Sequence, residues 1–292
     1  MKKTLLVLAL TAFAAQAHAA TWTLGNTSTS GLRIGIVTLT DTVDNLGTAG
    51  DSLFGSIGND INETTADSVT VGSWDATTAS LGGNSIDLGV SHEAKVSIAE
   101  NVAIAYLMTN VSLDNATIAD ADLTLDYSAL APARLSQTFI IAPELGESMG
   151  DLVNVSFDSF ADHTLEGNLN ADSLTFDQDF HSSYDLYLNG SVIDASSFAA
   201  LGHVDGAWNF QAHIGDVIKL EMRSQSQFAG SALGLPAGGS PYLLGESEAF
   251  ASMTVTTVPE PETWAMLVMG LGLVSLRLRN KSKSSARNQI GA

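Results

Sequence analysis

Cysteine is absent from this 292-residue chain, which therefore has no disulfide, no cysteine-ligated metal site and no thiol nucleophile. Basic residues are scarce in the middle of the chain, where five Lys or Arg stand against 30 Asp or Glu between Ala20 and Val258. The formal charge of this stretch is −25, and a surface so acidic repels the phosphates of nucleic acid. Nucleic acid is therefore excluded as a partner, whereas a hydrophobic fraction of 45% is enough for a folded core.

The amino-terminal residues have the three parts of a secretory signal peptide. Lys2 and Lys3 give a positively charged start, Leu5 to Ala15 form a short apolar run, and small residues stand at Ala17 and Ala19. We expect export through the general secretory translocon and cleavage by signal peptidase after Ala19, or one residue later. The predicted signal peptide therefore spans residues 1–19.

The carboxyl end has a different three-part pattern. Pro259, Glu260 and Pro261 form a rigid, extended strip, because proline fixes φ and keeps the residue before it out of the helical region. A segment of apolar and small residues follows, and we assign it to the membrane: Trp264, Leu267, Gly270, Gly272 and Leu276. Basic residues come next and are predicted to stay in the cytoplasm: Arg277, Arg279, Lys281 and Lys283. The apolar segment is shorter than the roughly 20 residues that a stable span needs, so we predict a transient anchor.

This order of proline strip, short apolar helix and basic end resembles the PEP-CTERM sorting signal. In that family a membrane transpeptidase, exosortase, is thought to cut at the Pro-Glu-Pro motif and pass the body to the cell surface of Gram-negative bacteria that make exopolysaccharide. The resemblance covers residues 258–283 and implies that exosortase and the membrane are partners before processing, and that the product is at the cell surface or outside the cell. Residues 284–292 are expected to form a polar cytoplasmic tail. An ordinary single-pass tail anchor is the alternative.

Short runs of β-branched and aromatic residues, separated by Gly, Asn, Asp and Ser, fill the region from Thr21 to Thr257. Apolar and polar residues alternate in these runs, which is typical of strands with one buried face. The clearest runs are Leu32–Thr40, Val102–Met108, Leu135–Ile141, Val153–Phe157, Trp208–Ala212, Ile218–Met222 and Ala249–Thr256. The pattern predicts a mainly β ectodomain of many short strands, residues 20–257, folded as a β-sandwich or jelly roll between a signal helix and a short transmembrane helix.

Two segments of this region predict a hairpin and a set of loops. Tyr184–Leu188 and Ser191–Ile193 flank Asn189-Gly190, and we expect a hairpin there because Asn-Gly favours the turn that matches strand twist. The stretch from Asp41 to Gly83 is poorer in apolar residues and is punctuated by glycines. We therefore expect long loops or an insertion in it.

One motif in the body matches an enzyme pattern. Gly146-Glu147-Ser148-Met149-Gly150 fits the elbow that presents the nucleophile of serine esterases, with Ser148 as that nucleophile. The elbow requires a helix after the serine, but residues 151–155 alternate as a strand does. A loop bounded by glycines is the favoured interpretation, and no catalytic residue is assigned.

Candidate metal and sugar sites are weighed against scattered histidines, solvated acids and core tryptophans, which are the favoured interpretations. The histidines of the body lack a metal-ligand spacing: His92, His163, His181, His203 and His213. Asp120 with Asp122, or Asp177 with Asp179, offers neighbouring carboxylates to Ca²⁺ without completing a calcium-binding loop. The tryptophans of the body suit either sugar stacking or core packing: Trp22, Trp74 and Trp208. No metal ligand and no cofactor is assigned.

The favoured prediction is an exported surface protein whose body is non-enzymatic and has a structural or adhesive role in the exopolysaccharide layer of a biofilm. A carbohydrate-binding or Ca²⁺-dependent lectin-like module is the alternative, and a serine esterase that uses Ser148 is a third hypothesis.

Overall fold

The computed structural model describes residues 20–41, 47–61, 68–119, 123–144 and 146–258, together with the short pieces 269–271 and 273. Ala17, Ala19, Asp120 and Asp122 lie outside the described residues. So do the predicted sorting residues Pro259 to Pro261, the basic cluster from Arg277 to Lys283, and the membrane-segment residues Trp264, Leu267, Gly272 and Leu276. The chain divides into two compact units, Met1–Thr256 and Thr257–Ala292.

Strands make up nearly all of the described part of the first unit. In chain order they are β1 (Thr21–Asp41), β2 (Thr48–Ile61), β3 (Ser68–Leu81), β4 (Asn84–Ala99), β5 (Val102–Thr117), β6 (Leu123–Ala142), β7 (Leu152–Asn168), β8 (Ser173–Leu188), β9 (Ser191–Phe198), β10 (Gly202–His213), β11 (Val217–Leu235) and β12 (Tyr242–Thr257). The prediction of a mainly β body is therefore confirmed.

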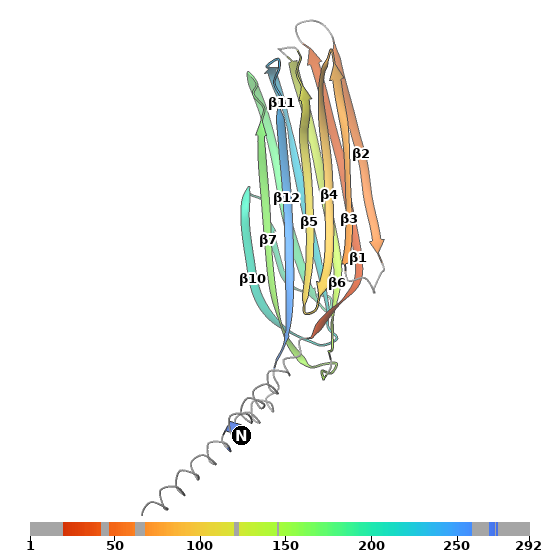
Figure 1. Cartoon of the computed structure of the whole chain (residues 1–292), viewed down its shortest axis with the longest axis vertical. Coiled ribbons are helices and arrows are strands. Elements are labelled where there is room, and N and C mark those ends of the chain that lie inside the picture. The colour runs from red at the N-terminus through yellow and green to blue at the C-terminus, as the bar shows by residue number, and fades with distance from the viewer. Residues whose placement is uncertain are drawn as a thin grey trace, which may run out of the picture. The chain divides into compact units, whose positions relative to one another are not determined.

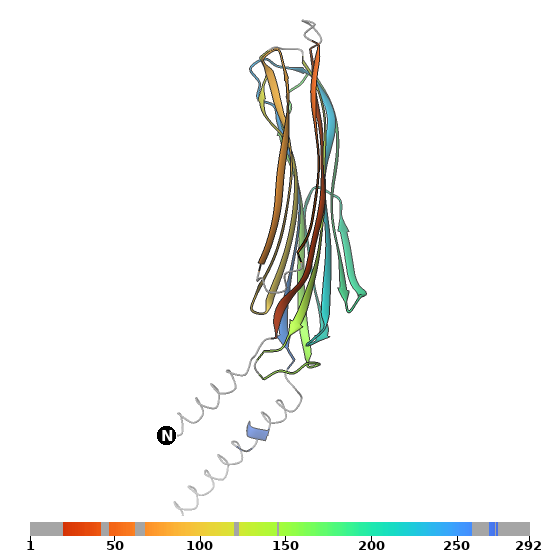
Figure 2. The same cartoon turned by 90° about the vertical axis from the view of Figure 1, so that its right-hand side faces the viewer.

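The strands form two antiparallel, six-stranded sheets that face each other as the layers of a sandwich (Figures 1 and 2). Sheet A has the order β2-β1-β6-β11-β8-β9, and sheet B has the order β10-β7-β12-β5-β4-β3. The 21 residues of β1, at about 3.3 Å per residue, extend over roughly 70 Å, so the sandwich is much longer than it is thick.

The strands are longer than the alternating runs predicted, because glycines that appear to end a run lie inside a strand. Gly31, just before the predicted run Leu32–Thr40, is an example: it lies inside β1, and a Cβ atom at this position would lie 3.0 Å from Cε1 of His92 on the opposite sheet. Glycine in a strand interior permits such close approach of two layers. The prediction of many short strands is therefore wrong in strand length, although the paired-sheet architecture is as expected.

The prediction of loops or an insertion between Asp41 and Gly83 is also wrong. This region contains β2 and β3, which are the edge strands on one side of the two sheets. An edge strand contributes little to the core, so a few inward side chains such as Leu53, Val69 and Val71 are enough to hold it. Its low apolar content reflects its position in the sheet.

The Asn189-Gly190 hairpin is confirmed, since β8 and β9 pair through it in antiparallel register. Both turn residues have positive φ, 49° at Asn189 and 84° at Gly190. This is the geometry of the tight turns whose twist matches that of the flanking strands.

The interior of the sandwich contains two apolar clusters, one in each half of its length. The first includes the large side chains of Trp22, Phe139 and Phe157. The second includes Leu39, Ile86 and Phe228. Several strands contribute to both clusters, and β5 does so through Leu107 in the first cluster and Val111 in the second.

A buried polar layer separates the two clusters. Its core members are 2% exposed or less: Thr109, His163, Ser182, Ser224, Ser226 and Ser247. Hydrogen bonds of 3.0 Å join Thr109 to Ser224 and Ser226, Ser224 to Ser247, Ser247 to Ser182, and Ser182 to Nε2 of His163. The chain of hydroxyls runs from strand to strand across both sheets, so buried polar groups that would be costly alone are satisfied together.

His92 lies in the same interior zone without such partners. It is 6% exposed, and neither of its ring nitrogens has a hydrogen-bond partner among the described residues. Burial lowers the pKa of His92, and the positive charge of Arg33 lowers it further. An unfolded chain, in which a histidine has a pKa of about 6.5, then binds more protons than the folded protein as the pH drops below that value. His92 therefore makes stability fall as the solution is acidified.

We predict that His92→Leu unfolds at no lower urea concentration than the wild type at pH 7.5, because the substitution removes an unsatisfied buried polar group. Between pH 7.5 and 5.5 the variant should lose less stability than the wild type, since its buried site no longer resists protonation. Urea unfolding at both pH values measures this, and His213→Leu, at a side chain that is 57% exposed, is the control. An equal or steeper loss in His92→Leu would contradict the account.

Candidate functional site

The last strand leads directly into the predicted sorting segment. β12 ends at Thr257, two residues before Pro259, and the compact unit formed by the sandwich ends at Thr256. β12 lies inside sheet B, between β7 and β5, so its register is held on both sides. The sandwich therefore keeps all of its strands if the chain is cut at the proline strip.

Both ends of the described sandwich meet at one turn. The indole Nε1 of Trp22, at the start of β1, donates a hydrogen bond of 2.9 Å to the carbonyl of Asn101, in the turn between β4 and β5. The backbone N–H of Val255, near the end of β12, donates to the same carbonyl at 3.0 Å, and the Asn101 amide donates to the Val255 carbonyl at 3.2 Å. The first and last strands thus leave the fold at the same end of the sandwich.

Little of the predicted membrane segment is described. Gly270 lies in a helical piece formed by residues 269–271, where Met269 and Leu271 are 58% and 61% exposed. Within the described residues, no helix has the length and apolar character needed to cross a membrane.

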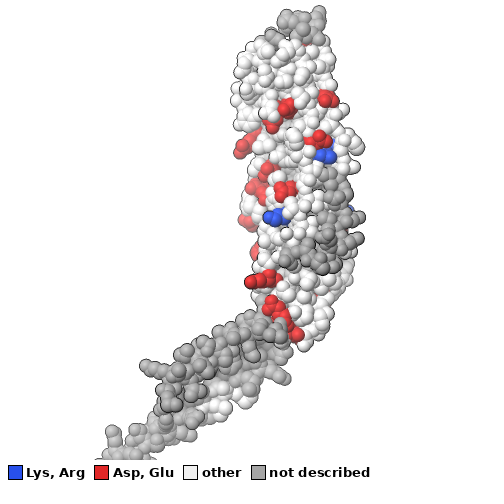
Figure 3. Space-filling model, turned by 45° about the vertical axis from the view of Figure 1, so that its right-hand side comes forward, with Lys and Arg blue, Asp and Glu red and all other residues white. Residues whose placement is uncertain are grey.

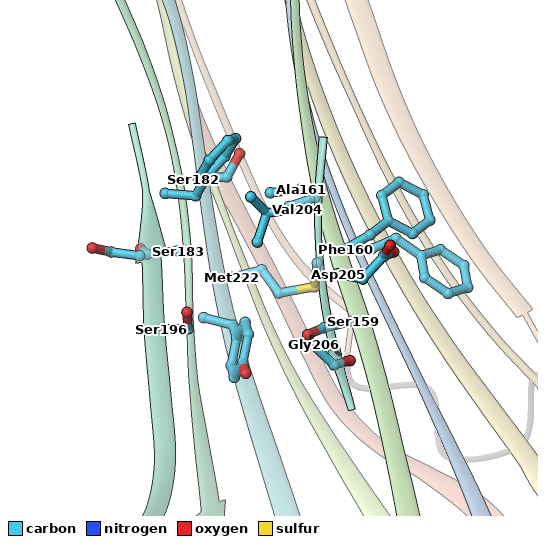
Figure 4. Close-up of a pocket in the computed structure, with 15 residues that line it drawn as sticks. Ser159, Phe160, Ala161, Ser182, Ser183, Ser196, Val204, Asp205, Gly206 and Met222 are labelled. Atoms are coloured by element: carbon cyan, nitrogen blue, oxygen red, sulfur yellow. Dashed lines mark hydrogen bonds between the residues drawn. The ribbon is translucent and has the colours of Figure 1, made fainter. Parts of the chain in front are cut away.

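A small cleft opens between the sheets beside β9 and β10. Its volume is about 60 Å³, and hydroxyl groups of β7, β8 and β9 line it, among them Ser159, Ser182 and Ser196. Met222 lies in the middle of the cleft, as Figure 4 shows. The cleft is too small for a substrate larger than a few water molecules.

Ser182, which lines this cleft, and His163 form a pair of the kind used for nucleophilic catalysis. Nε2 of His163 lies 3.0 Å from Oγ of Ser182, and Nδ1 lies 3.0 Å from the carbonyl of Ala200, which fixes the proton on Nδ1. Burial lowers the pKa of His163 and keeps the imidazole neutral. However, Ser182 is only 2% exposed and also bonds to Ser247 in the polar layer, so this pair holds the two sheets together.

Ser148 occupies a turn between two strands, β6 and β7. Its backbone N–H donates to Oδ2 of Asp151 at 2.7 Å, and β7 begins at Leu152, where an esterase elbow would need a helix. The strand expected after Ser148 is therefore confirmed. The structure brings no histidine to the Ser148 side chain through any hydrogen bond of the described residues.

The other residues considered as ligands are dispersed. His203 and His213 pair with nearby aspartates on the surface, and Asp177 and Asp179 point outward from β8. In the part of the chain that the structure describes, no group of three or more His, Asp or Glu is placed to hold a metal ion. Trp22 is 2% exposed and Trp208 packs against the first apolar cluster, whereas Trp74 is 70% exposed.

Acidic side chains are distributed along the length of the sandwich on the face seen in Figure 3, with few basic ones between them. On the outer face of sheet B, burial raises the pKa of the Tyr106 hydroxyl, and the carboxylates of Glu248, Glu246 and Glu93 raise it further. Burial and the charge of Glu246 likewise raise the pKa of Glu248. Besides burial, both shifts reflect the close spacing of carboxylates on the outer face of sheet B.

A larger depression crosses the outer face of sheet A. It has a volume of about 550 Å³ and is lined from β2, β1, β6, β11 and β8. The strand register places its lining side chains in two adjacent rows. Ser30, Arg134 and Arg223 lie in one row, and the other crosses all five strands through Ser56, Leu32, Pro132, Gln225 and His181. Five strands spaced about 4.8 Å apart give a row of roughly 19 Å that runs across the strands. We call this depression the transverse groove. Sequence reasoning missed it, because its residues come together only through pairing of distant strands.

A network of charges lies beside the transverse groove. Glu221 is 8% exposed in its side chain and contacts the Arg134 guanidinium, while Nζ of Lys219 lies 2.5 Å from Oε1 of Glu221. Burial opposes ionisation of Glu221, but hydrogen bonds from Lys219 and Arg134 outweigh it and lower the pKa of this carboxyl. Arg223 is 54% exposed and lies 3.8 Å from Asp185, beyond hydrogen-bonding distance.

Comparison with known proteins identifies the carboxyl end. Residues 257–282 match the model of the PEP-CTERM protein-sorting motif, which confirms the predicted resemblance. The motif implies an exported protein with a C-terminal membrane anchor that exosortase processes. No curated protein matches the chain.

Several solved structures have a faint likeness to this chain. A PA14 sugar-binding domain from an RTX adhesin is 13% identical with a TM-score of 0.18, over 39% of this chain and 51% of that one. The CBM36-1 domain of a xylanase from the hindgut metagenome of Trinervitermes trinervoides is 12% identical with a TM-score of 0.18, over 44% and 79%. A family 35 carbohydrate-binding module from Clostridium thermocellum is 8% identical with a TM-score of 0.17, over 61% and 91%. The chain spans about half the length of the first of these.

Proposed function

We propose that this chain, which carries a PEP-CTERM sorting motif, is a surface protein that exosortase cuts at Pro259-Glu260-Pro261 and releases from its membrane anchor. The sandwich then serves as a non-enzymatic structural or adhesive element within the exopolysaccharide layer. Its acidic surface suits a hydrated polymer matrix, because net charge far from zero keeps a protein soluble and separate from its neighbours.

The observation that carries this proposal is the position of the motif. The matched residues begin at Thr257, the last residue of β12, so the motif starts where the folded body ends. A protease needs an extended, accessible segment, and prolines favour such a conformation while preventing its inclusion in a sheet. Cutting there would leave both apolar clusters complete.

An intact-mass measurement on protein taken from the surface of its native host tests this function. We expect a species that begins at Ala20 or one residue later and ends within or just before the Pro-Glu-Pro strip, with the mass of any attached glycan added. Full-length polypeptide as the dominant species, with its basic end retained, would refute exosortase processing.

Carbohydrate binding by the body is the second candidate, and the transverse groove is the observation that favours it. Its volume of about 550 Å³ falls in the range of ligand sites, and its row of polar side chains crosses several strands, as the contact surface for an extended polymer would. A glycan-binding screen with and without Ca²⁺ distinguishes a lectin-like body from a purely structural one. Binding that requires Ca²⁺ would favour the lectin-like alternative.

Absence of esterase activity is a separate prediction. Because Ser148 lies in a strand–turn–strand segment and Ser182 is buried, we expect no labelling of the protein by a serine-reactive fluorophosphonate. Ser148→Ala and Ser182→Ala are the matched variants. Labelling of the wild type that one of these variants abolishes would show that the body is an enzyme.

A further inference from the structure

The transverse groove gathers positive charge in a body that has very little of it. Three of the five basic residues between Ala20 and Val258 lie on the outer face of sheet A: Arg134, Lys219 and Arg223. Arg134 and Arg223 stand directly opposite each other on β6 and β11. Like charges in this cross-strand position destabilise a sheet, so their pairing calls for a compensating anion.

Both arginines have a carboxylate nearby, but only Arg134 is in hydrogen-bond contact with one. Glu221 contacts Arg134 and Lys219 and is nearly buried between them, so its charge is fully engaged. Asp185 lies 3.8 Å from Arg223, and Asp179 accepts a hydrogen bond of 2.9 Å from Gln225. The guanidinium of Arg223 therefore forms no hydrogen bond with a carboxylate of the described residues, although more than half of its side chain is exposed at the groove.

The chemistry of the lining defines the ligand. A guanidinium presents a planar set of donors that matches a carboxylate in two parallel hydrogen bonds. Ser30, Ser56 and His181, which also line the groove, offer donors and acceptors to hydroxyl groups. A row of roughly 19 Å across the strands accommodates several linked units of an extended polymer.

We propose that the transverse groove binds an acidic polysaccharide, a sugar polymer with carboxylate groups, and that Arg223 with Arg134 receives a carboxylate. This inference rests on the proposed location of the protein in an exopolysaccharide layer. The acidic remainder of the surface repels the same polymer, which confines it to the groove. Charges farther than about 8–10 Å from the groove are screened at physiological ionic strength, so the local arginines decide binding.

Fluorescence anisotropy with two matched probes tests the proposal on the full chain. One probe is a labelled oligomer of galacturonic acid, and the other is the same oligomer with every carboxylate methyl-esterified. We expect the acidic oligomer to bind at least tenfold more tightly than the ester, because only the free carboxylate satisfies the Arg223 donors.

Arg223→Gln should weaken binding of the acidic oligomer at least tenfold, whereas Lys95→Gln, which removes a charge from the outer face of sheet B, should leave it unchanged. Both variants replace exposed side chains, and equal thermal midpoints verify that they fold as the wild type does. Equal affinity for the two oligomers, no binding of the acidic oligomer, or undiminished binding by Arg223→Gln would overturn the proposal. Exosortase processing is measured independently, by intact mass. A lack of polysaccharide binding in the groove would therefore not contradict the proposed processing.

Discussion

Replacement of Pro259, Glu260 and Pro261 by alanine is expected to leave uncut precursor in the inner membrane and to abolish appearance of the protein at the cell surface. The alanines remove the fixed φ of two prolines, so the strip is free to join the apolar helix predicted after it. The triplet is also the part of the matched motif at which exosortase is proposed to act. The measurement is an immunoblot of membrane and surface fractions, followed by intact mass of each.

The control for this variant changes neighbouring residues of the same segment and spares the triplet. Glu262→Ala with Thr263→Ala should be processed as the wild type is, since the proline strip is intact. The sandwich itself should fold in both variants, because its last strand ends at Thr257. If the triple-alanine protein is processed at the normal rate, exosortase is not the agent that cuts this chain.

Trp22→Ala should lower the free energy of unfolding by about 3–5 kcal/mol, the range for removing a large buried aromatic side chain. Trp22 is 2% exposed and packs edge-on against Phe139, with ring centroids 6.1 Å apart. Its indole also donates the 2.9 Å hydrogen bond to Asn101, so the substitution leaves a cavity and breaks the tie between the first and last strands. Urea or thermal unfolding of the full chain measures the loss.

Trp74→Ala provides a matched comparison on β3, because it removes the same side chain from a position that is 70% exposed. The free energy of unfolding of Trp74→Ala should stay within about 0.5 kcal/mol of the wild-type value. If Trp74→Ala lowers the free energy of unfolding as much as Trp22→Ala does, the exposure of the two side chains does not determine their contribution to stability. That result would contradict the described packing.

Local signals in the sequence were enough to predict part of this fold. The Asn189-Gly190 hairpin depends on two adjacent residues that accept positive φ, so it is visible without knowledge of the rest of the chain. The same holds for the sorting motif, which is linear and needs no tertiary structure. The strands with strong alternation, such as Leu135–Ile141 within β6, follow from burial of one face.

Features that depend on partners distant in sequence were not predictable in this way. β2 and β3 have few apolar residues because each lies at a sheet edge, and only the sheet order shows this. Gly31 resembles a strand breaker until the approach of His92 is known. The transverse groove joins residues from Ser30 to Gln225, and its only signal in the sequence is that two of the few basic residues, Arg134 and Arg223, belong to it.

The buried hydroxyl groups in the middle of the sandwich determine how the strands are aligned along their length, which the apolar side chains do not. If a strand slides by two residues, every apolar side chain again points inward. The alternation of apolar and polar residues is therefore compatible with many alignments of one sheet on the other. Thr109 lies opposite Ser224 and Ser226 across the interior. Such a slide would place these hydroxyl groups against apolar side chains and break several hydrogen bonds at once. The five strands that contribute to this layer, β5, β7, β8, β11 and β12, are thereby fixed in one alignment relative to one another.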